Sequence, residues 1–313
     1  MADEGLEIAG HIFNHAPAVV AAGAFIERAM LLLQVIIGGL LLGAIYALFS
    51  AGLTLIWGMM NFINFAHGEF VMLGMYVALI VVTSLGGGPT VFSFIAAALL
   101  ATLGIALYFV LIRHVIRGPM MAQILSTFGL ALLLRYTAFY LFSANIVSLP
   151  QASFGLYNFG GILVPGSQLL SGVVAIVLTI ALHLLLTRTF VGSRLLAVAE
   201  DRNAAMLMGI RPDRMQALAW GLAAASAGIA GSLMAMSYPW SPSVGETFGL
   251  TAFVVVTLGG FGSVPGALYA GLIIGLLQAL SAYWLGPIYK DVVVYALFAA
   301  LLWLRPQGLM GKA

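Results

Sequence analysis

Long stretches without a charged residue constrain this chain more than any other feature of its sequence. No Asp, Glu, Lys or Arg lies between Arg28 and Glu69, between Arg135 and Arg188, or between Glu246 and Lys290. Each gap exceeds the roughly 20 apolar residues that an α-helix needs to cross a bilayer. Because 63% of the 313 residues are hydrophobic and only 7% are charged, the chain cannot cover a water-soluble globular surface. The sequence predicts a polytopic membrane protein.

The apolar runs indicate helices rather than the strands of a barrel. Barrel strands would be about ten residues long and alternate in polarity, whereas residues 31–49 do not alternate. We expect an all-α transmembrane domain over residues 31–313 with about eight to nine spans, some interrupted by glycine. Residues 1–30 are too broken for a span, and we expect an N-terminal extension that forms an interfacial or peripheral helix. The GxxxG spacing of Gly39 and Gly43 predicts close approach of another helix.

Basic residues predict the orientation. Arg113 and Arg117 follow one span, and five arginines lie in the segment 188–214, which we call the charged segment. Cytoplasmic loops are enriched in Lys and Arg, and two spans separate these basic regions, so both can face the cytoplasm. Counting spans from there predicts a cytoplasmic C-terminus, an outer N-terminus and an outer position for the uncharged stretch 143–167. The acidic start of the chain does not resemble a cleaved leader.

The charged segment contains the signals of a short helix. The Asp201 carboxylate can accept hydrogen bonds from the free amides of a helix that starts at Arg202, and Gly209 can end this helix in a left-handed conformation. Two interpretations stay open at this point. The segment is either an interfacial loop whose arginines meet anionic lipid headgroups, or a docking helix that offers Met and Leu side chains to a cytoplasmic partner.

Two glycine-containing breaks interrupt apolar runs, at residues 58–68 and 259–266, one in each half of the chain. Matched breaks indicate a binding site built from discontinuous helices, and ionisable groups at membrane depth mark substrate routes. The positions we expect along a substrate path are Asn61, Asn64, His67, Glu69, Gly260 and Gly262. In the alternative, structural interpretation, Asn64 and Glu69 cap helices near the interface, and the second break is a tight packed turn.

Arg135 lies inside a predicted span and has no opposite charge nearby in the sequence. We expect its long side chain to snorkel outward to the membrane surface. The alternative is an ion pair with Glu69 or Glu246, the acidic residues of other apolar regions.

Several function classes lack support in the sequence. The chain has no cysteine and its histidines are scattered, so we expect no metal site. A net charge of +2 gives no reason to expect nucleic-acid binding. No GxxxxGK[ST] is present, so any ATP would be hydrolysed by another chain. An integral-membrane enzyme that uses His67 and Glu69 as acid and base is an alternative function, and a channel-like facilitator is a third.

Four motifs, in the same order along the chain, resemble those of the branched-chain amino-acid ABC transporter permeases. They are INFAHGE at 63–69, AED with Ala205, Gly209 and Ile210 at 199–210, LGGFGSVPGA at 258–267, and RPQGL at 305–309. Together they cover about residues 31–311, which makes the set more specific than any one motif.

The resemblance implies a multi-pass permease subunit of an importer in the bacterial inner membrane, and not an enzyme. ATP and Mg²⁺ would bind two cytoplasmic ATPase subunits, and this chain would carry no cofactor and no catalytic residue. The other implied partners are a second, homologous or identical, permease chain, a periplasmic solute-binding protein and membrane lipid. The charged segment becomes the ATPase-coupling segment, with Ala199, Glu200, Asp201, Arg202, Ala205, Met208 and Gly209 as coupling residues. Branched-chain amino acids are the default solute; urea, short amides and small organic acids are the alternatives.

Overall fold

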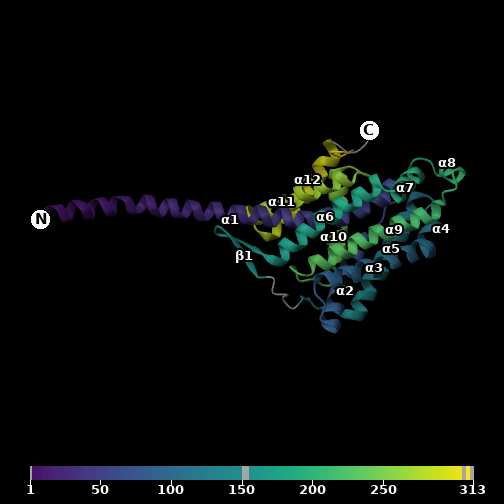
Figure 1. Ribbon diagram of the computed structural model, residues 1–313, viewed down its shortest axis with the longest axis horizontal. Helices are drawn as coiled ribbons and strands as arrows, with labels where there is room; N and C mark the ends of the chain where they lie inside the picture. The colour runs from purple at the N-terminus through teal and green to yellow at the C-terminus, as the bar shows by residue number, and fades with distance from the viewer. Residues whose placement is uncertain (1, 150–154, 305–307, 311–313) are drawn as a thin grey trace.

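The computed structural model describes residues 2–149, 155–304 and 308–310. In chain order the elements are α1 (Ala2–Met60), α2 (His67–Leu85), α3 (Pro89–Leu107), the π-helix η1 (Tyr108–Ile112), α4 (Arg113–Val115), α5 (Met120–Phe142), β1 (Leu156–Phe159), β2 (Ile162–Pro165), α6 (Gly166–Arg188), α7 (Phe190–Glu200), α8 (Arg202–Leu207), α9 (Pro212–Met234), α10 (Val244–Gly259), α11 (Val264–Leu285), the 3-10 helix η2 (Pro287–Tyr289) and α12 (Lys290–Leu304). The helices form an elongated bundle with the β-hairpin near one end and α8 at the other (Figure 1). We call these ends the hairpin end and the α8 end.

Eight helices of the described part are long and apolar enough to cross a membrane, in agreement with the predicted polytopic, all-α fold. A further apolar helix, α10, has 16 residues and spans about 24 Å at 1.5 Å per residue. This length is less than the roughly 30 Å hydrocarbon core of a bilayer, so α10 alone is too short to cross it. The chain is therefore a multi-pass integral membrane protein.

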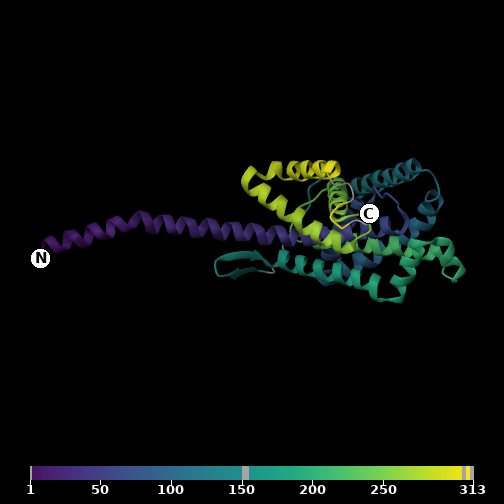
Figure 2. The same cartoon turned by 90° about the horizontal axis from the view of Figure 1, so that it is seen from above.

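α1 is one continuous helix of 59 residues. Its N-terminal part projects beyond the bundle at the hairpin end, and its C-terminal part runs through the bundle (Figures 1 and 2). The extension expected over residues 1–30 is thus, from Ala2 on, the start of this same helix. Its position at the membrane surface stays a prediction.

The first predicted break separates α1 from α2. Asn61 adopts a left-handed conformation with φ of 48°, which ends α1, and the Asn64 side chain accepts a hydrogen bond of 3.0 Å from the Ala66 amide. His67, the first residue of α2, donates from Nε2 to the carbonyl oxygen of Phe49 at 2.7 Å. Because α1 continues for another 11 residues after Phe49, or about 16 Å, α2 begins inside the bundle rather than at its surface.

The second predicted break separates α10 from α11. Gly260 and Gly262 have φ of 93° and 82°, values that side chains other than glycine rarely adopt. Ser263 then caps α11 by accepting a hydrogen bond of 3.1 Å from the Gly266 amide. The chain returns to this break near its C-terminus, where the amides of Leu309 and Met310 donate to carbonyls of the last turn of α10.

Glycines on α1 and α11 let the two backbones touch. A Cβ at Gly39 would lie 2.7 Å from the Cβ of Ala279, and one at Gly43 would lie 2.8 Å from the Cα of Leu272. Opposite them, a Cβ at Gly271 would overlap the backbone of Ala47. The close helix approach predicted from the GxxxG spacing is confirmed, and α11 is the partner. Such contact lets dispersion forces hold helices that gain no hydrophobic energy from meeting in lipid.

Arg135 on α5 turns into the bundle, so the expectation of a snorkelling side chain is wrong. Its guanidinium lies 2.7 Å from Glu69 on α2 and 2.8 Å from Glu246 on α10. The Glu69 side chain is only 2% exposed, and it fits because Gly245 has no side chain: a Cβ there would overlap the Glu69 carboxylate. Glu69 holds its charge in a buried position only if a cation faces it, which is the physical reason for the inward Arg135. This ion triad ties α5 to α2 and α10.

The stretch 143–167 contains a hairpin that the sequence did not predict. β1 and β2 pair antiparallel from Leu156 opposite Pro165 to Phe159 opposite Ile162. Gly160 and Gly161 both have positive φ, as a two-residue hairpin turn requires. A further bridge between Val147 and Trp240 joins this stretch to the segment before α10.

We predict that Gly43→Leu destabilises the fold, because its side chain would push the α1 and α11 backbones apart. Overpacking of this kind costs about 1–3 kcal/mol, measured as a lower free energy of unfolding of the purified chain in detergent. Gly129→Leu is the matched control, since a Cβ at Gly129 meets nothing within 4 Å. Equal stability of both variants would contradict this account of the packing.

We also predict that Arg135→Met lowers the free energy of unfolding by about 3–5 kcal/mol, because it leaves the Glu69 carboxylate buried without a cation. Arg202→Met is the control: it breaks the pair between Arg202 and Asp213, whose side chains are 29% and 57% exposed, and exposed pairs contribute about 1 kcal/mol or less. The same denaturation experiment measures both. Similar losses would show that Arg135 and Arg202 stabilise the fold equally, against this prediction.

Candidate functional site

The charged segment folds into two capped helices at the α8 end. Thr189 caps α7 by accepting a hydrogen bond of 3.1 Å from the Gly192 amide. Asp201 then separates α7 from α8, and its carboxylate accepts from the amides of Asn203 at 2.7 Å and Ala204 at 3.0 Å. The predicted cap is confirmed, and the helix that it starts ends at Leu207.

The end of α8 is equally well defined. The Gly209 amide donates to the carbonyl of Met206, and the Ile210 amide donates to the carbonyl of Ala205, each at 3.0 Å. Together with a φ of 78° at Gly209, these bonds form the Schellman motif of a helix end. An ion pair of 2.8 Å between Arg202 and Asp213 also joins α8 to the first turn of α9. A helix of six residues is not stable alone, and here both ends are held.

α8 has one anchored side and one free side. Ala205 is 3% exposed and packs in an apolar cluster with Leu195 and Val198 of α7. Leu207 and Met208, in contrast, are 89% and 82% exposed. Since this end is also rich in arginine, it combines an apolar contact surface with charged residues, as docking surfaces do.

A cavity of about 610 Å³ opens at the α8 end, between α7 and the two breaks. We call it the inner cavity. It brings together four of the expected site residues, namely Asn61, Ala199, Glu200 and Gly262. A Cβ at Gly58 would lie 3.1 Å from the Cα of Gly262, and the rings of Trp57 and Phe261 lie 4.5 Å apart. The two breaks, far apart in sequence, therefore face one another beside the charged segment.

The other expected path residues lie elsewhere. Asn64, His67, Glu69 and Gly260 are buried in the bundle and line neither the inner cavity nor the outer cavity described below. Among the described residues, the Asn64 Nδ2, His67 Nδ1 and Glu69 Oε2 atoms have no hydrogen-bond partner. Each such buried atom costs about 1–3 kcal/mol. Their role in a substrate path stays a prediction.

A second cavity, of about 620 Å³, lies toward the hairpin end between α1, α6, α10, α11 and α12. We call it the outer cavity. Its polar lining side chains are Tyr46, Gln168, Tyr238, Thr247, Gln278, Tyr283, Lys290 and Asp291. The Tyr46 hydroxyl donates to Gln278 Oε1 at 2.7 Å, and Gln278 Nε2 donates to Asp291 Oδ1 at 2.9 Å. Burial raises the pKa of the Tyr238 phenol, so it stays neutral and able to donate.

None of these outer residues was predicted from the sequence. The structure places Lys290 and Asp291 in the first turn of α12. One signal was present: Gln278 is the only carboxamide in the apolar stretch of α11, and polar groups at membrane depth mark functional positions.

Within the described ranges, no three His, Asp or Glu side chains gather as metal ligands would.

Comparison with known proteins gives the family. Residues 35–302 match the family model described as branched-chain amino acid transport system / permease component. The high-affinity branched-chain amino acid transport system permease protein BraD of Pseudomonas aeruginosa is 33% identical over 90% of this chain and 96% of its own length. The corresponding protein LivH of Escherichia coli is 32% identical over 91% of this chain and 97% of its own length.

A more distant relative is the permease protein LivM of Escherichia coli, 28% identical over 85% of this chain and 68% of its own length. No solved structure matches the chain. The family match covers most of the chain and agrees with the membrane-spanning helices and with the motifs at both breaks. The chain belongs to the family of branched-chain amino acid transport system permease components.

Proposed function

We propose that this chain is a permease subunit of an ATP-binding-cassette importer in the bacterial inner membrane, and that it moves branched-chain amino acids. The observation that carries the proposal is α8: a short helix, capped at both ends, that exposes Leu207 and Met208 at one end of the bundle. A transport chain without a nucleotide site needs such a surface to receive motion from ATPase subunits. Two ATPases, a second permease chain and an external binding protein complete the proposed complex.

The route of that motion runs from α8 to the breaks. Ala205 joins α8 to an apolar cluster that also contains Leu186 of α6 and Ala219 of α9. Glu200, directly before the Asp201 cap, lines the inner cavity with Asn61 and Gly262. Displacement of α8 therefore reaches both breaks through packed contacts, without any disordered link. Rigid-body movement of this kind is a common way to open and close a site.

The proposed solute follows from the relatives. BraD and LivH are named as high-affinity branched-chain amino acid permeases, and two permease proteins, LivH and LivM, are named for that system in Escherichia coli. A heterodimer with a second permease is accordingly proposed here. Urea, short amides and small organic acids remain the competing solutes, and the orientation with α8 and the C-terminus in the cytoplasm is part of the proposal.

The proposal is tested by reconstituting the complete complex in proteoliposomes with ATP inside. We expect labelled leucine, isoleucine and valine to enter only when both ATP and the binding protein are present, and to stimulate ATP hydrolysis. A panel of urea, short amides and small organic acids, each with its cognate binding protein, tests the alternatives. Uptake without ATP would indicate a facilitator, and stimulation by another solute alone would replace the proposed substrate.

We predict that Gly209→Val uncouples the complex. Valine in a left-handed conformation costs about 1–2 kcal/mol, which is enough to unwind a helix of six residues that depends on its caps. We expect at least a tenfold loss of ATP-dependent uptake and weaker co-purification of the ATPase subunits.

Gly86→Val is the matched control, because Gly86 has a similar φ of 60°, open surroundings and the same helix-ending role in α2, away from α8. It should leave uptake and co-purification close to wild type. Equal effects of both variants, or none from either, would contradict the role assigned to α8.

A further inference from the structure

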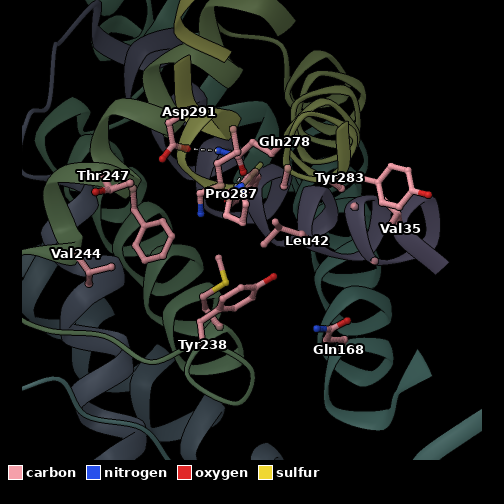
Figure 3. Close-up of a pocket in the computed structure, with 18 of the residues that line it drawn as sticks. Val35, Leu42, Gln168, Tyr238, Val244, Thr247, Gln278, Tyr283, Pro287 and Asp291 are labelled. Carbon is pink, nitrogen blue, oxygen red and sulfur yellow. Dashed lines mark hydrogen bonds between the residues drawn. The ribbon is translucent and has the colours of Figure 1, made fainter. Parts of the chain in front are cut away.

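The outer cavity is built from elements that are far apart in sequence. Its lining residues come from α1, α6, α9, α10, α11, η2 and α12 and from the segment between α9 and α10. Asp291 and Gln278 lie on one side, while Tyr238 lies on the other with its hydroxyl directed into the space between (Figure 3). The volume of about 620 Å³ lies within the range of small-molecule sites, roughly 300–1,000 Å³.

Neither charged residue of this cavity, Lys290 or Asp291, takes part in an ion pair of the described residues. The ion pairs of the described residues involve Arg135 and Arg202, and neither reaches the cavity. Asp291 is held only by the neutral Gln278 amide, which in turn accepts from Tyr46. This chain of hydrogen bonds fixes one carboxylate oxygen, and Asp291 takes part in no ion pair of the described residues. Lys290 lines the same cavity, so a cation and an anion stand next to one another at its wall.

The rest of the wall is apolar. Val35 and Leu42 of α1 and Val244 and Phe248 of α10 line the cavity, and Val244 and Leu42 flank the space on opposite sides (Figure 3). A side chain without polar atoms can be desolvated there at no electrostatic cost, and burying an aliphatic chain contributes about 1.5–3 kcal/mol. One part of the cavity wall thus carries a positive and a negative residue, and the rest of the wall is apolar.

We propose that the outer cavity is a substrate site of the permease, and that it selects zwitterionic α-amino acids with aliphatic side chains. The α-ammonium group binds Asp291, the α-carboxylate binds Lys290, and the side chain lies against Leu42 and Phe248. This inference rests on the proposed transport function. It also narrows the class of solute, because urea has no charge to pair with Lys290 or Asp291, and an organic acid has no ammonium group to pair with Asp291.

Asp291→Asn tests the proposal in the complete reconstituted complex. The asparagine oxygen can still accept from Gln278, so the variant removes the charge and keeps the shape. Leucine uptake should fall about 10- to 100-fold, the loss that corresponds to a hydrogen bond with a charged group. Glu27→Gln is the matched control: Glu27 is an exposed carboxylate of α1 outside the cavity, and its variant should transport like wild type.

The outcomes separate this site from the function on which it rests. If the wild-type complex takes up no branched-chain amino acid with ATP, the proposed function fails. If wild type transports and Asp291→Asn transports equally well, the function stands and the outer site is overturned. Co-purification of the ATPase subunits should be the same for wild type and both variants, because Asp291 and Glu27 lie far from α8.

A second experiment decides the matter even if Asp291→Asn fails to assemble. The chain has no cysteine, so Thr247→Cys introduces a single thiol into the outer cavity, and Ser243→Cys places one on an exposed residue nearby that does not line it. Leucine should slow labelling of Thr247→Cys by a membrane-impermeant maleimide and leave Ser243→Cys unchanged. 4-Methylpentanoate, which lacks the amino group, should not protect. Equal labelling with and without leucine, or equal protection by both compounds, would overturn the proposal.

Discussion

Backbone contact at glycine is the interaction on which the rest of this structure depends. Helices in lipid gain no hydrophobic energy from meeting, so dispersion between closely fitting surfaces must hold them together. Gly39 and Gly43 of α1 meet α11 in this way, and a Cβ at Gly68 of α2 would overlap the backbone of α10 at Gly249. The second contact also brings α2 deep into the bundle, where it can begin at the level of Phe49 instead of at the membrane surface.

The same contacts explain why the two cavities are mechanically related. α1 lines the outer cavity with Leu42 and Tyr46 and the inner cavity with Trp57 and Gly58. α10 begins at the outer cavity with Val244, and the break that follows it lines the inner one. Two rigid helices thus touch both spaces. In the proposed mechanism, a small rotation at the α8 end would change the two cavities together, because closely packed helices shift as units rather than deform.

Local signals made part of this structure predictable. Asp201 and Gly209 define α8 through bonds to residues at most five positions away, so the sequence alone identified both ends of the helix. The partners of Arg135 lie 66 and 111 positions away, and no local pattern could choose between pairing and snorkelling. The Tyr46 hydroxyl and Gln278 are 232 positions apart, which is why the outer cavity was missed although Gln278 stood out in an apolar run.

Glu69 and Asp291 have different bonding partners, and the partner determines how readily each carboxylate can bind an ammonium group of a substrate. Glu69 is buried and already faces the Arg135 guanidinium, so a bound ammonium group would have to displace a cation that stabilises the fold. Asp291 faces a cavity and is held by a neutral amide. An ammonium group there adds a charge-assisted bond without breaking an existing ion pair. Glu69, in the conspicuous sequence motif, is therefore already paired with a cation, whereas Asp291 is bonded to an amide and takes part in no ion pair of the described residues.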